Sequence, residues 1–279
     1  MKKLIDFDGE YMRFAAARLK DAGELSDAAL QDALNESMRA WLNEKADWLG
    51  GLTPDAYFSQ MDDASLVALM RDYCDANMDV PEPLYYQLLR RLGIDESLGA
   101  ITMDASANEA ARSTALRILC DTNAGNVTDL CISLLVNGSC LTPMAAQWLT
   151  DAGYDAAQTL LKVYDGADEA IQEVMLDVLC YYPGIPRTAE LLADKLLQDH
   201  EHRAQHAAMA ARLGDPALIE PLQRLSKLSE LSYYDYKEIV NAIDSLGGEM
   251  GEERQFSGDP DYELMRDPDI SNLGGMSDN

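Results

Sequence analysis

The stretch ARLGDPALIEPLQRLSK, residues 211–227, has the clearest structural pattern in the chain. Gly214 follows an alanine-rich helical run and can adopt the left-handed conformation that ends a helix. Asp215 can cap the next helix, and Pro216 suits its first turn, where a missing N–H costs nothing. Pro221 is expected to kink that second helix near its start, because it removes one hydrogen bond and clashes one turn back. The stretch therefore predicts a helix, a tight turn and a bent helix.

The same unit recurs through the middle of the chain at a spacing of about 30 to 34 residues. Leucines mark the ends of the first helices of successive pairs: Leu119, Leu149, Leu179, Leu213 and Leu246. A spacing in this range is typical of stacked helical repeats, in which each helix pair buries the apolar face of its neighbour. The sequence thus predicts an all-α protein built from stacked helix pairs.

The stretch at residues 211–227 resembles a HEAT repeat, in which an Asp-Pro turn joins two helices and a proline lies near the start of the second. Other pairs depart from this pattern: residues 109–138 lack the Asp-Pro, and residues 168–200 carry YYPGIPR in its place. The resemblance covers about half the chain. It implies a short right-handed α-solenoid of HEAT-like (armadillo-type) helix pairs and says little about function.

Composition divides the chain into three segments. Residues 1–100 form an N-terminal helical segment, either a divergent cap of the stack or a small bundle, and residues 101–247 form the HEAT-like pairs. Residues 248–279 are rich in Gly, Asp and Pro without an apolar period, which predicts an acidic flexible tail. Within it, DPDYELMRDPD (259–269) holds apolar residues, and the alternative interpretation of this stretch is a short docking motif.

Capping residues and aromatic residues give the N-terminal segment more detail. A short polar residue before an apolar run predicts a helix start. Such starts fall at Ser26 or Asp27, at Thr53 before Pro54, and at Asp62 or Asp63. The expected core of the segment contains Trp41, Trp48, Tyr57 and Phe58.

The charge of the 279-residue chain is −27, and it limits the expected partners. A surface this acidic repels phosphate backbones and anionic lipids, so neither nucleic acid nor membrane is an expected partner. No apolar run reaches the roughly 20 residues of a membrane-spanning helix. The five scattered cysteines form no C-x-x-C pair, and MKKLIDFDGEYMRF has no apolar run behind its lysines. Reduced thiols and a cytoplasmic location are expected.

All three histidines lie in DHEHRAQH, residues 199–206. On one helix, Asp199, His202 and His206 would share a face, which would supply half of a metal site. The alternative interpretation is a polar junction between two repeats. The chain has no other histidine for a two-metal centre, and no nucleophile elbow, phosphate loop or dinucleotide motif. The sequence therefore favours a non-enzymatic protein over an enzyme and predicts no cofactor.

The leading hypothesis is a non-enzymatic protein–protein interaction module or scaffold. It would present a concave acidic solenoid surface to a neutral or basic protein. Helical periodicity and the tyrosine pairs select these contact residues: Asp129, Lys162, Arg187, Lys195, Glu220, Arg224, Tyr182 and Tyr234. Two alternatives remain open, namely a metal-dependent enzyme or metal-binding regulator that uses the histidine cluster, and an acidic mimic of nucleic acid.

Overall fold

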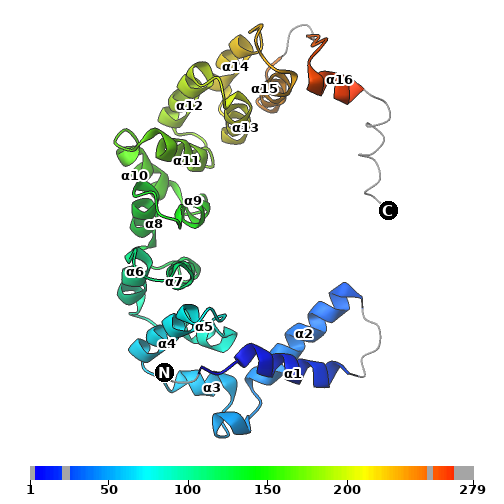
Figure 1. Ribbon diagram of the computed structural model, residues 1–279. Coiled ribbons are helices and arrows are strands. Elements are labelled where there is room, and N and C mark those ends of the chain that lie inside the picture. Colours follow the sequence, from blue (N-terminus) through cyan, green and yellow to red (C-terminus); the bar gives the residue numbers. More distant parts are fainter. Residues whose placement is uncertain (1–3, 21–25, 250–253, 267–279) are drawn as a thin grey trace. The chain divides into compact units, whose positions relative to one another are not determined.

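The computed structural model describes residues 4–20, 26–249 and 254–266. These residues form sixteen α-helices and two short 3₁₀ helices, with no β-strand among them (Figure 1). The predicted all-α class is therefore confirmed. Across the same residues, no helix combines the length and the apolar character that crossing a membrane requires.

The described residues divide into two compact units. Unit 1 takes the chain up to Leu134 together with Ser139–Leu141, and unit 2 takes Leu135–Gly138 and the residues from Thr142 onward. The helices of unit 1 are α1 (Phe7–Leu19), α2 (Asp27–Leu42), η1 (Asp47–Leu49), α3 (Pro54–Ser59), α4 (Asp63–Asp75), α5 (Glu82–Leu89), α6 (Asp95–Met103), α7 (Glu109–Asp121) and most of α8 (Val127–Val136).

An aromatic cluster forms the start of unit 1. The ring of Phe7, on α1, is fully buried, and its centroid lies 4.9 Å from that of Phe58 and 5.3 Å from that of Trp48. Trp41 and Tyr57 complete the cluster around the same ring. The four aromatic residues expected in this core are therefore together, and Phe7 is the residue at their centre.

The predicted capping residues start their helices as expected. The Ser26 hydroxyl accepts a hydrogen bond from the Ala29 N–H, and Thr53 Oγ1 accepts one from the Ala56 N–H at 3.1 Å. Further along, α6 packs along α7, and α7 packs on α4 and α5. The packing of α6 on α7 spans residue 100, where the sequence places a segment boundary, so unit 1 extends past that point.

Unit 2 consists of helices that pack on neighbours close in sequence. They are α9 (Thr142–Leu149), α10 (Tyr154–Tyr164), α11 (Glu169–Leu179), α12 (Pro186–Gln198), α13 (Arg203–Leu213), η2 (Pro216–Leu218), α14 (Ile219–Leu225), α15 (Tyr233–Ser245) and α16 (Pro260–Arg266). α11 contacts α9, α10 and α12, α13 contacts α12 and α15, and α14 contacts α12 and α15.

The turn between α13 and α14 has the predicted chemistry. Gly214 has φ +70°, and the Asp215 carboxylate accepts a hydrogen bond from the Ala217 N–H at 2.9 Å. The predicted cause of a kink at Pro221, the loss of a hydrogen bond within the helix, is wrong. The chain first makes the 3₁₀ turn η2, so α14 starts at Ile219 and Pro221 lies in its first turn. A first-turn N–H has no partner within the helix, and its absence costs no bond.

The flexible tail expected for residues 248–279 is wrong for residues 254–266, because these residues pack on α15. Phe256 is buried, and its ring centroid lies 4.9 Å from that of Tyr236 and 5.5 Å from that of Tyr233. The ring of Tyr262, on α16, lies 5.1 Å from that of Tyr233. Residues 250–253 and 267–279 are outside the described part of the chain.

One carboxylate, that of Asp259, accepts hydrogen bonds from the first turns of two helices at this contact. Asp259 Oδ2 accepts a hydrogen bond from the Tyr233 N–H at 2.9 Å, in the first turn of α15. Asp259 Oδ1 accepts from the N–H groups of Asp261 and Tyr262, in the first turn of α16. These bonds to charged acceptor oxygens lower the pKa of Asp259, with the Tyr233 N–H as the main cause.

Candidate functional site

The predicted single helix through Asp199, His202 and His206 is wrong. α12 ends at Gln198, Asp199 is its C-cap in an extended conformation, and His202 is the N-cap of α13. The turn nevertheless brings the three side chains close. Asp199 Oδ2 lies 2.9 Å from His202 Nδ1, and the ring centroids of His202 and His206 are 6.3 Å apart. The connection between the helices, and not a shared helix face, gathers the cluster.

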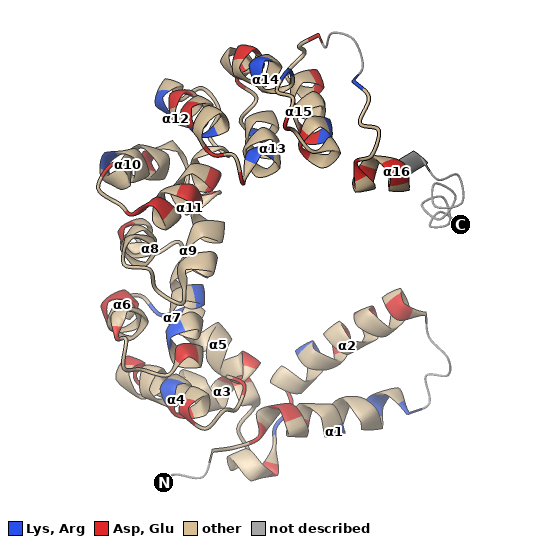
Figure 2. Cartoon of the chain, turned by 45° about the horizontal axis from the view of Figure 1, so that its top comes forward, with Lys and Arg blue, Asp and Glu red and all other residues tan. Residues whose placement is uncertain are grey.

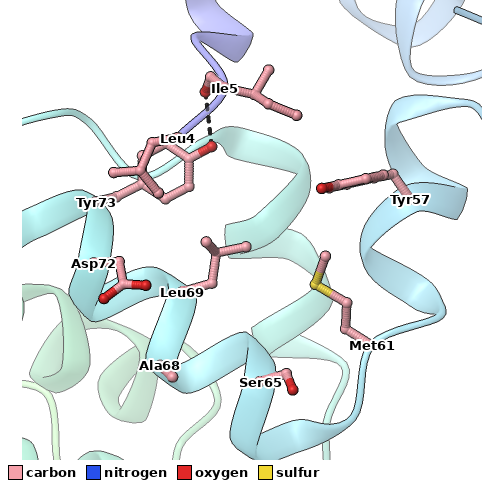
Figure 3. A pocket seen from close by; sticks show the side chains of 9 residues that line it. All are labelled: Leu4, Ile5, Tyr57, Met61, Ser65, Ala68, Leu69, Asp72 and Tyr73. Atoms are coloured by element: carbon pink, nitrogen blue, oxygen red, sulfur yellow. Dashed lines mark hydrogen bonds between the residues drawn. The ribbon is translucent and has the colours of Figure 1, made fainter. Parts of the chain in front are cut away.

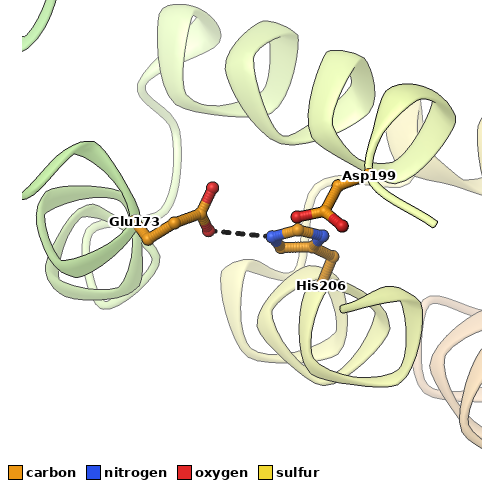
Figure 4. A group of neighbouring side chains, drawn as sticks. All are labelled: Glu173, Asp199 and His206. Atoms are coloured by element: carbon orange, nitrogen blue, oxygen red, sulfur yellow. Dashed lines mark hydrogen bonds and ion pairs between the residues drawn. The ribbon is translucent and has the colours of Figure 1, made fainter. Parts of the chain in front are cut away.

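A residue that the sequence analysis missed completes the cluster. Glu173, on α11, places its Oε2 2.9 Å from Nε2 of His206, on α13. Ligand atoms of Glu173, Asp199 and His206 all lie within 4.8 Å of one another, and both carboxylates face the imidazole (Figure 4). The His206 side chain is 0 % exposed, and its Nδ1 has no hydrogen-bond partner among the described residues.

Lys195 supplies a positive charge to this cluster. Its Nζ lies 2.5 Å from Glu173 Oε1 and 3.5 Å from Glu169 Oε1, and its side chain is 17 % exposed. Helical periodicity predicts that Lys195 is an open contact residue, and the structure contradicts this prediction. On α12, the residue instead turns toward α11 and pairs with carboxylates there.

The local charges hold the carboxylates of the cluster ionised. Burial raises the pKa of Glu173, but hydrogen bonds from His206 and Lys195 outweigh it and lower the pKa overall. Burial likewise opposes ionisation of Asp199, and His202 with the backbone N–H of Glu201 lowers its pKa below the usual value. Burial lowers the pKa of Lys195, yet its two glutamate partners raise it overall. The cluster thus has two anionic oxygen donors, an imidazole and a compensating ammonium.

Tyr182 is the second predicted contact residue that the structure places elsewhere. Its side chain is buried, its hydroxyl donates to the Leu149 carbonyl, and it accepts from the Gly153 N–H at 3.2 Å. The neighbouring Tyr181 is exposed instead, with the Arg212 guanidinium 4.4 Å from its ring centroid. Tyr182 therefore joins the turn after α11 to the end of α9 and does not face a partner.

The other six predicted contact residues are exposed, and several are already paired. Arg187 forms ion pairs with Asp165 and Glu190 at 3.5 and 3.4 Å, and Arg224 pairs with Glu220 at 2.6 Å. Exposed pairs of this kind contribute little to stability. The exposed residues are Asp129 in unit 1 and Lys162, Arg187, Glu220, Arg224 and Tyr234 in unit 2.

Tyr234 belongs to a pocket of about 300 Å³ on α15 and α16. Its side chain is 56 % exposed, and that of Leu264, on α16, is 55 % exposed. The pocket is lined by Tyr233, Tyr234, Lys237, Glu238, Asp261 and Leu264. The composition of residues 248–279 predicts a flexible chain and assigns no contact role to Leu264. The apolar residues of DPDYELMRDPD are the signal that points to it.

A second pocket, of about 240 Å³, lies in unit 1 between the extended start of the described chain and α4 (Figure 3). Leu4, Tyr57, Met61 and Leu69 give it apolar walls. The Tyr73 hydroxyl donates to the Ile5 carbonyl at 2.8 Å, and burial raises the pKa of Tyr73 to about 12. The pocket holds a single carboxylate, Asp72, which gives it no cluster of reactive groups.

Comparisons of this chain with protein-family models, with curated proteins and with solved structures find no match. The resemblance to HEAT repeats therefore has no support from these comparisons.

Proposed function

We propose that this chain is a non-enzymatic protein–protein interaction module, and that the pocket on α15 and α16 receives an apolar side chain from a basic segment of the partner. The observation that carries the proposal is that one pocket is lined by two exposed large side chains, those of Tyr234 and Leu264. Both large side chains are more than half exposed, and they line the same pocket. Exposed aromatic residues beside a pocket are favoured anchors of protein interfaces.

Contacts in the segment before α16 hold this helix against α15, so the pocket exists before a partner binds. The aromatic contacts of Phe256 with Tyr233 and Tyr236 hold the connection to α16 against α15. Arg254 adds a hydrogen bond to the Ser229 carbonyl at 2.7 Å, and its guanidinium lies 4.7 Å from the Phe256 ring centroid. A partner would therefore meet a wall that is already in place, which lowers the ordering cost of binding.

Charge selects the chemistry of the partner. Glu238 and Asp261 line the pocket, with Lys237 as the one basic lining residue, and Figure 2 shows further acidic residues on α15 and α16. The whole chain carries a charge of −27. Lysine or arginine residues beside the inserted apolar side chain would be attracted by this field, which salt screens.

The same proposal includes the finer features of the fold and the cellular location. We infer that the helix pairs between residues 101 and 247 are HEAT-like, supported by the turn at Gly214, Asp215 and Pro216 and by the packing of neighbouring helices in unit 2. We also infer a cytoplasmic location, supported by five cysteines that are all free thiols in the structure.

Fluorescence anisotropy with two labelled peptides of equal length tests the binding proposal. One peptide carries leucine flanked by lysines, and the other carries leucine flanked by glutamates. The lysine peptide is expected to bind, and its affinity should fall as salt rises. Leu264→Ser should weaken binding at least about tenfold, because an apolar anchor of this size contributes more than 1.4 kcal/mol.

Leu197→Ser is the matched control, because Leu197 is an exposed leucine on α12 that does not line the pocket. It should leave the affinity of the lysine peptide unchanged. Equal binding of the two peptides, or equal binding by wild type and the Leu264→Ser variant, would refute the proposal.

A further inference from the structure

We propose that Glu173, Asp199 and His206 bind a divalent first-row transition metal ion, with Zn²⁺ as the best match, in exchange for the Lys195 ammonium. This site is separate from the pocket on α15 and α16 and does not depend on its function. The three ligands come from α11, from the C-cap of α12 and from α13, so a bound ion would join three helices of unit 2.

The spacing of the ligand atoms is close to that of a zinc site. Zn–N and Zn–O bonds of about 2.1 Å place two ligands of a tetrahedral ion about 3.4 Å apart. One ligand atom from each of the three residues lies within 4.8 Å of the others, and His206 Nε2 and Glu173 Oε2 are 2.9 Å apart. Shifts of the two carboxylates by about an ångström would give the ligand atoms the spacing of a zinc site.

The buried ring nitrogen of His206, unpaired within the described part of the chain, indicates that this cluster binds a ligand. A fully buried imidazole nitrogen normally has a hydrogen-bond partner, because burial without one is costly. His206 is 0 % exposed, and its Nδ1 has no such partner among the described residues. The imidazole lies beside two carboxylates (Figure 4), so a metal ion there would meet nitrogen and oxygen donors together.

Lys195 shows that this position already holds a cation. Its Nζ lies 2.5 Å from Glu173 Oε1 and neutralises one of the two carboxylates. Glu169, whose side chain is 86 % exposed, is only 3.5 Å from the same Nζ. The ammonium can therefore turn toward Glu169 and leave Glu173 to a metal ion without losing an anionic partner.

The ligand set favours zinc over the harder cations. Imidazole suits Zn²⁺ and its neighbours in the first row, whereas Mg²⁺ and Ca²⁺ prefer sites made of oxygen alone. Three protein ligands leave a fourth position for water. His202 is near, but its Nδ1 already contacts Asp199 Oδ2 at 2.9 Å and thereby orients that carboxylate.

Titration of the full, untagged chain with ZnCl₂ tests the proposal, with CoCl₂ as a spectroscopic probe of the coordination geometry. The expected result is one Zn²⁺ per chain and visible Co²⁺ bands of tetrahedral intensity, both unaffected by millimolar Mg²⁺. Lys195→Met should raise the Zn²⁺ affinity at least tenfold, because it removes the competing cation. Glu173→Gln and His206→Gln should lower it at least tenfold, with folding checked by circular dichroism.

Lys162→Met is the matched control, since Lys162 is an exposed lysine on α10 outside the cluster. It should leave the affinity unchanged. Several weak equivalents of Zn²⁺ that are the same in every variant would mean nonspecific binding to the acidic surface and would overturn the proposal. So would a Lys195→Met variant that folds normally and binds Zn²⁺ no more tightly than wild type.

Discussion

Removal of one hydroxyl, in Tyr182→Phe, tests whether this buried tyrosine, in the turn after α11, holds α9 in place. The hydroxyl donates to the carbonyl of Leu149, the last residue of α9, and accepts from the Gly153 N–H. A net hydrogen bond contributes about 1 kcal/mol, and an unsatisfied buried carbonyl costs about 1–3 kcal/mol. The expected loss of unfolding free energy is therefore about 2 kcal/mol, or roughly 30-fold in the unfolding constant.

Urea denaturation followed by circular dichroism measures this loss, and hydrogen–deuterium exchange locates it. Faster exchange is expected in peptides from α9, α10 and α11, with little change in unit 1. Tyr181→Phe is the matched control, because Tyr181 is exposed and keeps its aromatic ring over Arg212. The control should change stability by less than about 0.5 kcal/mol. The reasoning fails if both variants lose the same stability, or if Tyr182→Phe loses none.

Three further predictions concern the turn, the tyrosine of α4 and the end of the described chain. Gly214→Ala should lower the free energy of unfolding by about 1–2 kcal/mol, because a side chain is strained at the φ of +70° that Gly214 has. In the same thermal melts, the control Gly125→Ala should leave the free energy of unfolding unchanged, because Gly125 lies outside the left-handed region. The folded-state pKa of Tyr73, about 12, exceeds the unfolded value of 10.0, so its stability contribution is complete below pH 10 and lost between pH 10 and 12. Tyr73→Phe should flatten the loss of stability over that range in alkaline denaturation. Phe256→Ala should release α16 by removing about 3 kcal/mol of buried contact, seen as faster hydrogen exchange in residues 254–266 with α9 unchanged.

The features predicted well from the sequence are those that depend on residues two or three apart. Thr53 bonds to the N–H of Ala56, and Asp215 bonds to that of Ala217, so the residue types alone select the cap. The left-handed conformation of Gly214 follows from the absence of a Cβ in the same local way. These rules located helix starts and the turn, and they established the all-α class.

The features missed depend on contacts between distant residues. Glu173 is 33 residues before its partner His206, and no local pattern connects a glutamate on α11 with a histidine on α13. Tyr181 and Tyr182 are adjacent in the turn that follows α11, and only contacts with the neighbouring helices decide that Tyr182 is the buried one. The aromatic contacts of Phe256 and Tyr262 are likewise invisible to a compositional rule that predicts a flexible tail.

The carboxylate of Asp259 has a practical consequence for anyone who shortens this protein. Because it bonds to Tyr233 as well as to Tyr262, cutting the chain at Gly247 would take away part of the start of α15 along with the last helix. The cut would also uncover the rings of Tyr233 and Tyr236, which Phe256 now covers. A fragment that ends after Arg266 keeps both helix starts and is the safer choice for crystallisation or labelling.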